Sequence, residues 1–239
     1  MSEFTYHNLF ETKGIEYIIT IVFFLLLIPF WILLNRKEKS EQTVTVLKGI
    51  LTPAFLTSPK GLFYGKNHTW AFMQKSGMAR VGLDDLLVHL TGDVKVSLLK
   101  NVGEEVKKGE LFAELEKDGK RLKIFSPVSG SVVKSNARLI ADAAVLQADP
   151  YGQGWLMEIE PANWVSETSG YYLAERATEW LKTEFSRFKD FVIQTISAQS
   201  MENAQLVMQD GGELMDQTLK NLPEDTWNNF QKEFLQLEE

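Results

Sequence analysis

The sequence contains no cysteine and only three histidines, and these scarcities exclude several kinds of site. A chain without cysteine has no disulfide, no thiolate zinc site, no cysteine-ligated iron–sulfur cluster and no thiol nucleophile. The histidines are His7, His68 and His89, too few to favour a metal site, and we expect His68 to make a structural hydrogen bond rather than to bind a ligand. The formal net charge of −7 at pH 7 argues against a nucleic-acid partner, which would require a basic surface.

Patterns typical of enzymes are also missing. Gly103 and Gly109 are too far apart for a dinucleotide-binding turn, and the chain has no Gly-Lys-Ser/Thr phosphate loop. Asp84 and Asp85 lie where acidic side chains favour the start of a helix, and no nucleophile or second base accompanies them. We therefore predict a protein without catalytic activity, for which a carrier role stays open.

One long apolar run stands near the N-terminus. Residues Tyr17 to Leu34 contain no charged side chain, and a helix of that length reaches across most of a bilayer core of roughly 30 Å. Tyr17 and Trp31 lie near its ends, where aromatic side chains favour the membrane interface. The sequence thus predicts a transmembrane helix over 17–34, preceded by a short segment over 1–16.

The charges beside this run predict its orientation. Arg36, Lys37 and Lys39 follow it, whereas Lys13 is the only lysine or arginine before it, so we expect the N-terminus outside and the C-terminal domain in the cytoplasm. The alternative is a cleaved signal peptide, but the preceding segment lacks a positive excess and no small-residue cleavage site follows. Residues 35–62 are expected to form a linker, with a short strand over 43–47.

The segment Glu116–Pro127 predicts a tight β-hairpin. Asp118-Gly119 is a signal for a type I′ turn, because both central residues of that turn need positive φ. The apolar residues on either side alternate with charged ones, which is typical of two strands that cover a core and carry a charged tip. These apolar residues are Leu111, Ala113, Leu115, Leu122 and Ile124.

Together with its flanks, the hairpin resembles the H protein of the glycine cleavage system, a small lipoyl-carrier domain. The motifs that carry the resemblance are Asn67-His68-Thr69-Trp70, Leu90-Thr91-Gly92-Asp93-Val94, Val102–Glu110, Ser126–Val132 and Asp149–Leu156. The resemblance covers residues 63–164 and implies a mainly β fold, a lipoyl-like barrel-sandwich hybrid of two small sheets. Here this domain is expected to lie between an N-terminal transmembrane helix and a C-terminal α-helical extension.

The resemblance also implies a covalent lipoyl group on a lysine three residues after a glutamate at the hairpin tip. Glu116 matches the glutamate, but Gly119 stands at the lysine position, and Lys120 follows one residue later. A shift of one residue in a strand turns a side chain to the opposite face. We therefore predict no cofactor, with a lipoyl group on Lys120 as the alternative.

The tip itself is basic in an otherwise acidic chain. Lys117, Lys120 and Arg121 are interpreted either as solvated charge that protects two strands from pairing or as a docking site for an acidic partner. A second candidate docking surface lies in the C-terminal extension, 165–239. There, apolar residues recur at three- and four-residue steps and predict an amphipathic helix over 170–200, followed by a last helix that begins near Pro223.

The apolar stripe of the longer helix must be buried, either on the chain's own domain or on a partner subunit. Its candidate docking residues are Trp180, Phe185 and Phe188. A lipid surface is the weaker reading, because acidic residues balance the basic ones beside the stripe.

These features predict a membrane-anchored, non-lipoylated accessory or structural subunit of a membrane complex, with electron transfer as one candidate process. Its expected partners are the lipid bilayer and other subunits of that complex, and not nucleic acid. Two alternatives stay open: a membrane-tethered lipoyl carrier that uses Lys120, and a periplasmic adaptor with a lipoyl-like domain.

Overall fold

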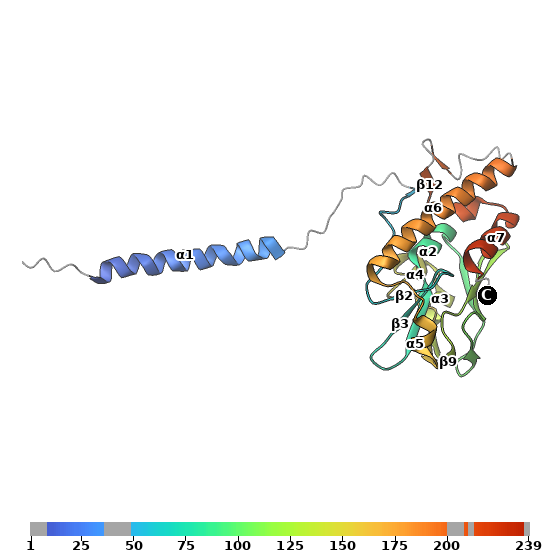
Figure 1. The fold of residues 1–239 in the computed structure, drawn as a ribbon, viewed down its shortest axis with the longest axis horizontal. Coiled ribbons are helices and arrows are strands. Elements are labelled where there is room, and N and C mark those ends of the chain that lie inside the picture. The colour runs from blue at the N-terminus through green and yellow to red at the C-terminus, as the bar shows by residue number, and fades with distance from the viewer. Residues whose placement is uncertain (1–8, 36–48, 200–207, 210–212, 237–239) are drawn as a thin grey trace, which may run out of the picture. The chain divides into compact units, whose positions relative to one another are not determined.

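The computed structural model describes residues 9–35, 49–199, 208–209 and 213–236 (Figure 1). The chain forms two compact units, Met1–Leu47 and Lys48–Glu239. The predicted strand over 43–47 lies outside the described residues.

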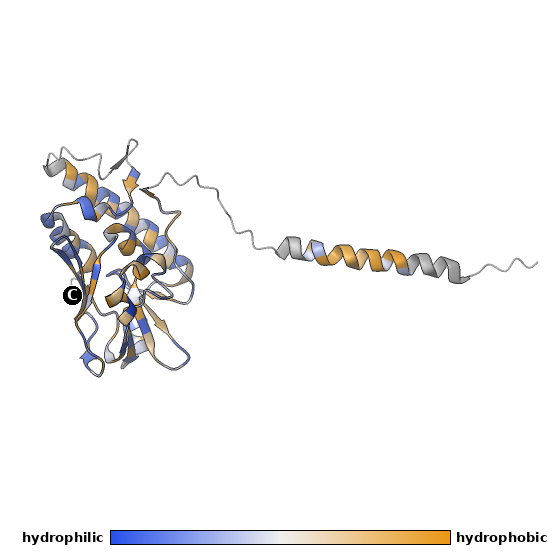
Figure 2. Ribbon diagram, turned by 180° about the vertical axis from the view of Figure 1, so that it is seen from behind, coloured by the Kyte–Doolittle hydropathy of each residue, from blue (hydrophilic) through white to orange (hydrophobic). Residues whose placement is uncertain are grey.

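The described part of the first unit is helix α1 (Leu9–Asn35). Its side chains are described from Tyr17 to Trp31, where they are exposed and almost all apolar (Figure 2). Within the described part of the chain, no helix is long and apolar enough to cross a membrane. This finding contradicts the predicted transmembrane helix over 17–34, and with it the predicted single-pass location with the N-terminus outside and the C-terminal domain in the cytoplasm.

The second unit is built on a six-stranded sheet whose neighbouring strands all pair antiparallel. Its strands, in spatial order, are β2 (Phe63–Tyr64), β3 (Thr69–Met73), β4 (Ala79–Leu83), β10 (Met157–Pro161), β9 (Gly130–Ser135) and β6 (Glu105–Val106). The hairpin between β3 and β4 turns at Gly77, whose φ of +85° suits a residue without a side chain.

A three-stranded sheet carries the hairpin from which the fold was inferred. It has the order β5 (Lys95–Leu98), β7 (Leu111–Lys117) and β8 (Lys120–Phe125). Lys117 pairs with Lys120, and Asp118 and Gly119 between them have φ of 50° and 81°. The predicted two-residue turn is thus confirmed. Ala113, Leu115, Leu122 and Ile124 are buried in one core with the larger sheet, whereas Leu111, where the strand register shifts, is only partly buried.

Four short helices connect or follow the strands of the β domain. They are α2 (Asp85–Thr91), α3 (Ala137–Ala141), α4 (Ala144–Ala148) and α5 (Trp164–Thr168). Helix α2 begins where the paired acidic residues predicted, because the Asp84 carboxylate accepts a hydrogen bond from the Leu87 N–H at 2.9 Å and caps the first turn.

The C-terminal extension folds onto the same unit. Its elements are α6 (Ala174–Gln199), β11 (Met208–Gln209), β12 (Glu213–Met215), the 3₁₀ helix η2 (Thr218–Asn221), α7 (Glu224–Phe230) and the π-helical turn η3 (Gln231–Leu235). β12 lies between β11 and β1 (Ile50–Leu51), so the segment predicted as a linker contributes a strand. Both amphipathic helices lie close to their predicted positions, and α6 is the longest helix of the second unit (Figure 1).

The apolar faces of these two helices pack on each other. Phe230 and Phe234 stack at 4.8 Å between ring centroids, and Phe188 of α6 meets both rings edge-on. The predicted stripe is therefore buried within its own chain, which answers the question of what covers it.

Candidate functional site

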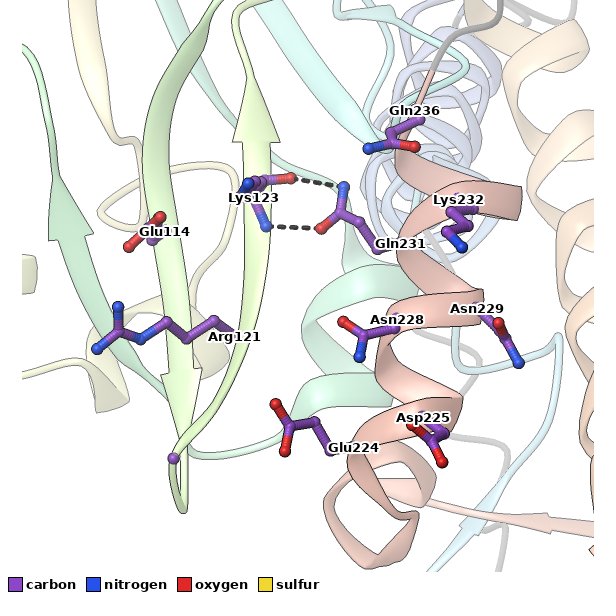
Figure 3. A pocket seen from close by; sticks show the side chains of 11 residues that line it. Glu114, Arg121, Lys123, Glu224, Asp225, Asn228, Asn229, Gln231, Lys232 and Gln236 are labelled. Carbon is purple, nitrogen blue, oxygen red and sulfur yellow. Dashed lines mark hydrogen bonds between the residues drawn. The ribbon is translucent and has the colours of Figure 1, made fainter.

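A polar groove of about 850 Å³ separates the hairpin from α7 (Figure 3). All of its lining residues are polar or charged apart from Gly119. They are Glu114, Gly119, Arg121, Lys123, Glu224, Asp225, Asn228, Asn229, Gln231, Lys232 and Gln236. Small-molecule sites are usually lined mainly by apolar side chains, so the groove is better described as the border between the hairpin and the C-terminal segment Thr218–Leu235.

Lys120 reaches across this border. Its Nζ donates hydrogen bonds to the carbonyl oxygens of Lys220 at 2.8 Å and Leu222 at 2.9 Å, and it lies 5.2 Å from the centre of the Trp227 ring. Burial lowers the pKa of Lys120, although the nearby charge of Asp118 opposes this effect. The hairpin ammonium is thus held by three groups of the C-terminal segment, and we call this arrangement the Lys120 clamp.

Local structure explains why these carbonyl groups are available. η2 ends at Asn221, and the last carbonyl groups of a helix have no partner inside it and carry partial negative charge. Pro223 then starts α7 and places Trp227 one turn later, where its Nε1–H donates to the Leu219 carbonyl at 2.7 Å. Trp227 is fully buried, so the platform under Lys120 is fixed.

A second contact joins the C-terminal segment to the hairpin. The side-chain amide of Gln231 accepts from the Lys123 N–H at 2.6 Å and donates to the Lys123 carbonyl at 3.1 Å (Figure 3). These are the two backbone bonds that a neighbouring strand would make. Gln231 therefore covers part of the outer edge of β8, which would otherwise be open for pairing.

The predicted basic tip is only partly exposed. Lys120 is engaged in the clamp, Lys117 is half-buried across the turn, and Arg121 is exposed beside Glu116, with 3.7 Å between Nε and the carboxylate. The structure thus does not present these three side chains as one free basic surface, because the C-terminal segment takes up the central one.

The other predicted docking residues, Trp180, Phe185 and Phe188, require a correction. Their exposed fractions are 8%, 6% and 0%, because they pack between α6 and the rest of the second unit. Trp180 stacks on His68 at 5.2 Å and on Tyr172 at 5.0 Å. These side chains stabilise the fold of the chain itself and are not available to a partner.

His68 makes the structural hydrogen bond that was expected, within a buried charged cluster. Its Nδ1 lies 2.7 Å from the Asp84 carboxylate, and its Nε2 lies 3.6 Å from the carboxylate of Glu184 on α6. Burial by itself would lower the pKa of His68, but the two carboxylates outweigh it and raise this pKa to about 9. His68 is therefore positively charged near neutral pH and links the β domain to α6.

Sequence reasoning missed Glu184 in this role, because it was counted among the balanced charges of a solvated helix flank. The only available signal was its spacing from Trp180 and Phe188, which places it on the apolar stripe of α6. Across the described residues, no group of three or more histidine or carboxylate side chains is arranged to hold a metal ion.

Comparison with known proteins finds one matching family and several similar proteins. Residues 62–184 match the family model described as glycine cleavage H-protein, so the match extends beyond residue 164 into α6. The probable glycine cleavage system H protein of Pyrococcus abyssi is 36% identical over 124 residues, which cover 52% of this chain and 92% of that protein. The glycine cleavage system H protein of Coprothermobacter proteolyticus is 38% identical over 101 residues, covering 42% of this chain and 80% of that protein.

Among solved structures, a glycine cleavage system H protein from Mycobacterium marinum is 32% identical, with a TM-score of 0.41; the similarity covers 44% of this chain and 87% of that one. The sequence similarities confirm the predicted resemblance and the mainly β, H-protein-like domain.

Proposed function

We propose that this chain, which belongs to the glycine cleavage H-protein family, carries no lipoyl group. It acts through its surface as an accessory subunit of a protein complex. The observation that carries this proposal is the Lys120 clamp. Lys120, the lysine next to the expected attachment point, is already bound by the chain's own C-terminal segment.

The hairpin does not fit a lipoyl group. Gly119 occupies the position at which the family resemblance places the modified lysine. At Lys120, an amide bond would remove the positive charge of Nζ and leave one N–H in place of three. That nitrogen would no longer satisfy both carbonyl groups or attract the Trp227 ring, so modification would cost the clamp most of its binding energy.

The clamp is an addition to the family pattern. Its partners Lys220, Leu222 and Trp227 lie beyond residue 184, where the family match ends. The matched segment of 124 residues already covers 92% of the Pyrococcus abyssi protein, so that relative has little length left for a corresponding segment. A segment that occupies the hairpin lysine supports a role based on protein contacts.

The adaptor alternative gains no support from the fold. Adaptors of that kind split the lipoyl-like domain with a long helical hairpin. Between β2 and β10 this chain has only α2, α3 and α4, of seven, five and five residues.

The proposal is tested by incubating the folded full chain with a lipoyl-attaching enzyme and its activated lipoyl donor. A lipoylated H protein of the family serves as the positive control, and Lys120→Arg as the negative control. We expect the positive control to gain the mass of a lipoyl group while the wild-type chain and Lys120→Arg do not. Modification of wild-type Lys120 would instead establish the carrier alternative and overturn the proposal.

The accessory role has a separate test. Full-length tagged chain, purified from its own cells after mild cross-linking, should bring down one or more partner proteins in a fixed ratio. Recovery of the chain alone, under conditions that preserve other complexes of those cells, would contradict the accessory role even if Lys120 is unmodified.

A further inference from the structure

A row of alternating charges crosses three neighbouring strands of the six-stranded sheet. Arg80 of β4 and Lys134 of β9 both lie opposite Glu158 of β10. Arg80 donates to one Glu158 oxygen from Nε at 3.2 Å and from an Nη at 2.8 Å. Glu158 therefore orients Arg80 and neutralises about one of the two positive charges beside it.

Trp155, just before β10, contacts both cations. The guanidinium carbon of Arg80 is 5.1 Å from its ring centre, and the Nζ of Lys134 is 5.5 Å away. Cations over an indole face are held by attraction to the ring. Trp155 is 9% exposed, so packing holds its side chain in place.

The loop that carries Trp155 is fixed by hydrogen bonds. The Asn136 side-chain amide donates to the carbonyl oxygens of Gln153 at 2.8 Å and Trp155 at 2.7 Å, and the Asp149 carboxylate accepts from the N–H groups of Gly152 and Gln153. Arg138 donates from Nη1 to the side-chain oxygen of Gln153 at 2.6 Å. A third cation is thus positioned by the same loop.

These groups line a cavity of about 390 Å³. Its lining contains three cationic side chains and no carboxylate, in a chain whose net charge is −7. The lining residues are Arg80, Lys134, Ser135, Asn136, Ala137, Arg138, Gly152, Gln153 and Trp155.

We propose that this cavity binds a small phosphate dianion, either free or as the phosphoryl group of a small organic molecule. After Glu158 is paired with Arg80, two positive charges remain at the cavity, on Lys134 and Arg138, and these match the charge of a phosphate dianion. Arg80 retains N–H groups for a charge-assisted bond, and Ser135 adds a hydroxyl. A single carboxylate would leave one of the two charges uncompensated.

A purely structural role explains only part of this arrangement. Arg80 is enough to compensate the negative charge of Glu158, and Gln74 also donates to that carboxylate at 3.0 Å. Arg138 makes no contact with Glu158 and is instead held by a neutral side chain at the cavity. The position of Arg138 is the feature that a bound anion accounts for.

Titration of the full chain with inorganic phosphate at constant ionic strength tests the site. The amide and indole N–H signals of Trp155 and the amide signals of Ser135 and Arg138 are followed by nuclear magnetic resonance. We expect these signals to shift in a saturable manner. Lys134→Gln and Arg138→Gln should each weaken binding by about tenfold, since each removes a charged hydrogen-bond donor. Lys95→Gln removes another exposed lysine, from the other sheet, and should leave the affinity unchanged.

Two outcomes would overturn the proposal: equal shifts with sodium chloride in place of phosphate, or equal phosphate affinity in wild type and both cavity variants. Thermal unfolding of each variant confirms that it is folded. A parallel titration with glycerol 3-phosphate separates the two sources, because tighter binding than inorganic phosphate assigns the site to an organic phosphate and weaker binding to the free ion.

Discussion

At the scale of single residues, two cations are held in place by partners distant in the sequence. Lys120 is bound by two carbonyl groups about a hundred residues away. His68 lies between the carboxylates of Asp84, which caps α2, and Glu184 of α6. Both interactions tie the C-terminal extension to the β domain. Each makes a prediction that a single substitution tests.

Replacing Lys120 by Met keeps the length of the side chain and removes its charge and donors. We expect the free energy of unfolding to fall by about 1–2 kcal/mol, because two carbonyl groups lose a charged partner. Urea unfolding measures the change. Lys117→Met, on the adjacent strand, is the matched control and should change stability by less than about 0.5 kcal/mol; equal effects of the two substitutions would argue against the clamp.

His68 predicts a dependence of stability on pH. Its pKa is about 9 in the folded chain, whereas an unperturbed histidine has a pKa of 6.5. Because the folded state binds this proton more tightly, the stabilisation is fully present below about pH 6.5 and is lost as the pH rises through 9, by roughly 3 kcal/mol in total.

His68→Asn removes the titrating group and should flatten the dependence of stability on pH. Asparagine is chosen because it also tolerates the positive φ of 58° at this position. His89 contributes in the same direction, because its hydrogen bond to Asp216 raises its pKa. The His89→Gln variant therefore serves as the comparison, and it should keep the larger share of the pH dependence of stability. Urea unfolding at a series of pH values distinguishes the two histidines; an unchanged slope in His68→Asn would contradict the cluster.

At the scale of elements, the edge of β8 depends on one glutamine. Gln231→Leu keeps the size of the side chain but leaves the N–H and C=O of Lys123 without this partner. We expect a loss of about 1–2 kcal/mol and faster hydrogen exchange of the Lys123 amide.

Gln236→Leu, from the same groove, is the control for Gln231→Leu. It should leave exchange at Lys123 slow. Slow exchange in Gln231→Leu as well would show that Gln231 does not protect the strand edge.

Elements with a local signal were predictable from the sequence. Asp118-Gly119 specified the hairpin turn, and three- and four-residue spacing located α6 and α7. The apolar run over 17–34 was read as a membrane span, and the described structure contradicts that reading. Composition and periodicity show that a segment avoids water but not which surface covers it. The sequence therefore left open whether Trp180 and Phe188 pack on the chain's own domain or on a partner.

The candidate site itself was only partly predictable. The departure of Gly119 from the family pattern is visible in the sequence, whereas the clamp depends on carbonyl groups, and these are present at every residue. The basic cavity combines Arg80 of β4 with Lys134 of β9 and Arg138 of α3. Such arrangements follow from strand register and loop geometry, which no local pattern encodes.

At the scale of the whole molecule, the C-terminal segment is an integral part of the second unit. Truncation after Gln217 would remove the clamp and uncover the aromatic faces of Phe188 and Phe191. We expect the truncated chain to bind a hydrophobic dye strongly, and its Lys120 to react faster with an amine-specific acylating reagent than in the full chain. Equal acylation rates at Lys120, measured by peptide mass, would mean that the segment does not shield the hairpin.

The most direct test of the central claim is the mass of the protein isolated from its own cells, combined with mapping of the peptide from Leu111 to Val128. We predict that Lys120 is unmodified in all of the protein. A lipoyl adduct on Lys120 would contradict that claim, because an acylated Nζ is incompatible with the clamp.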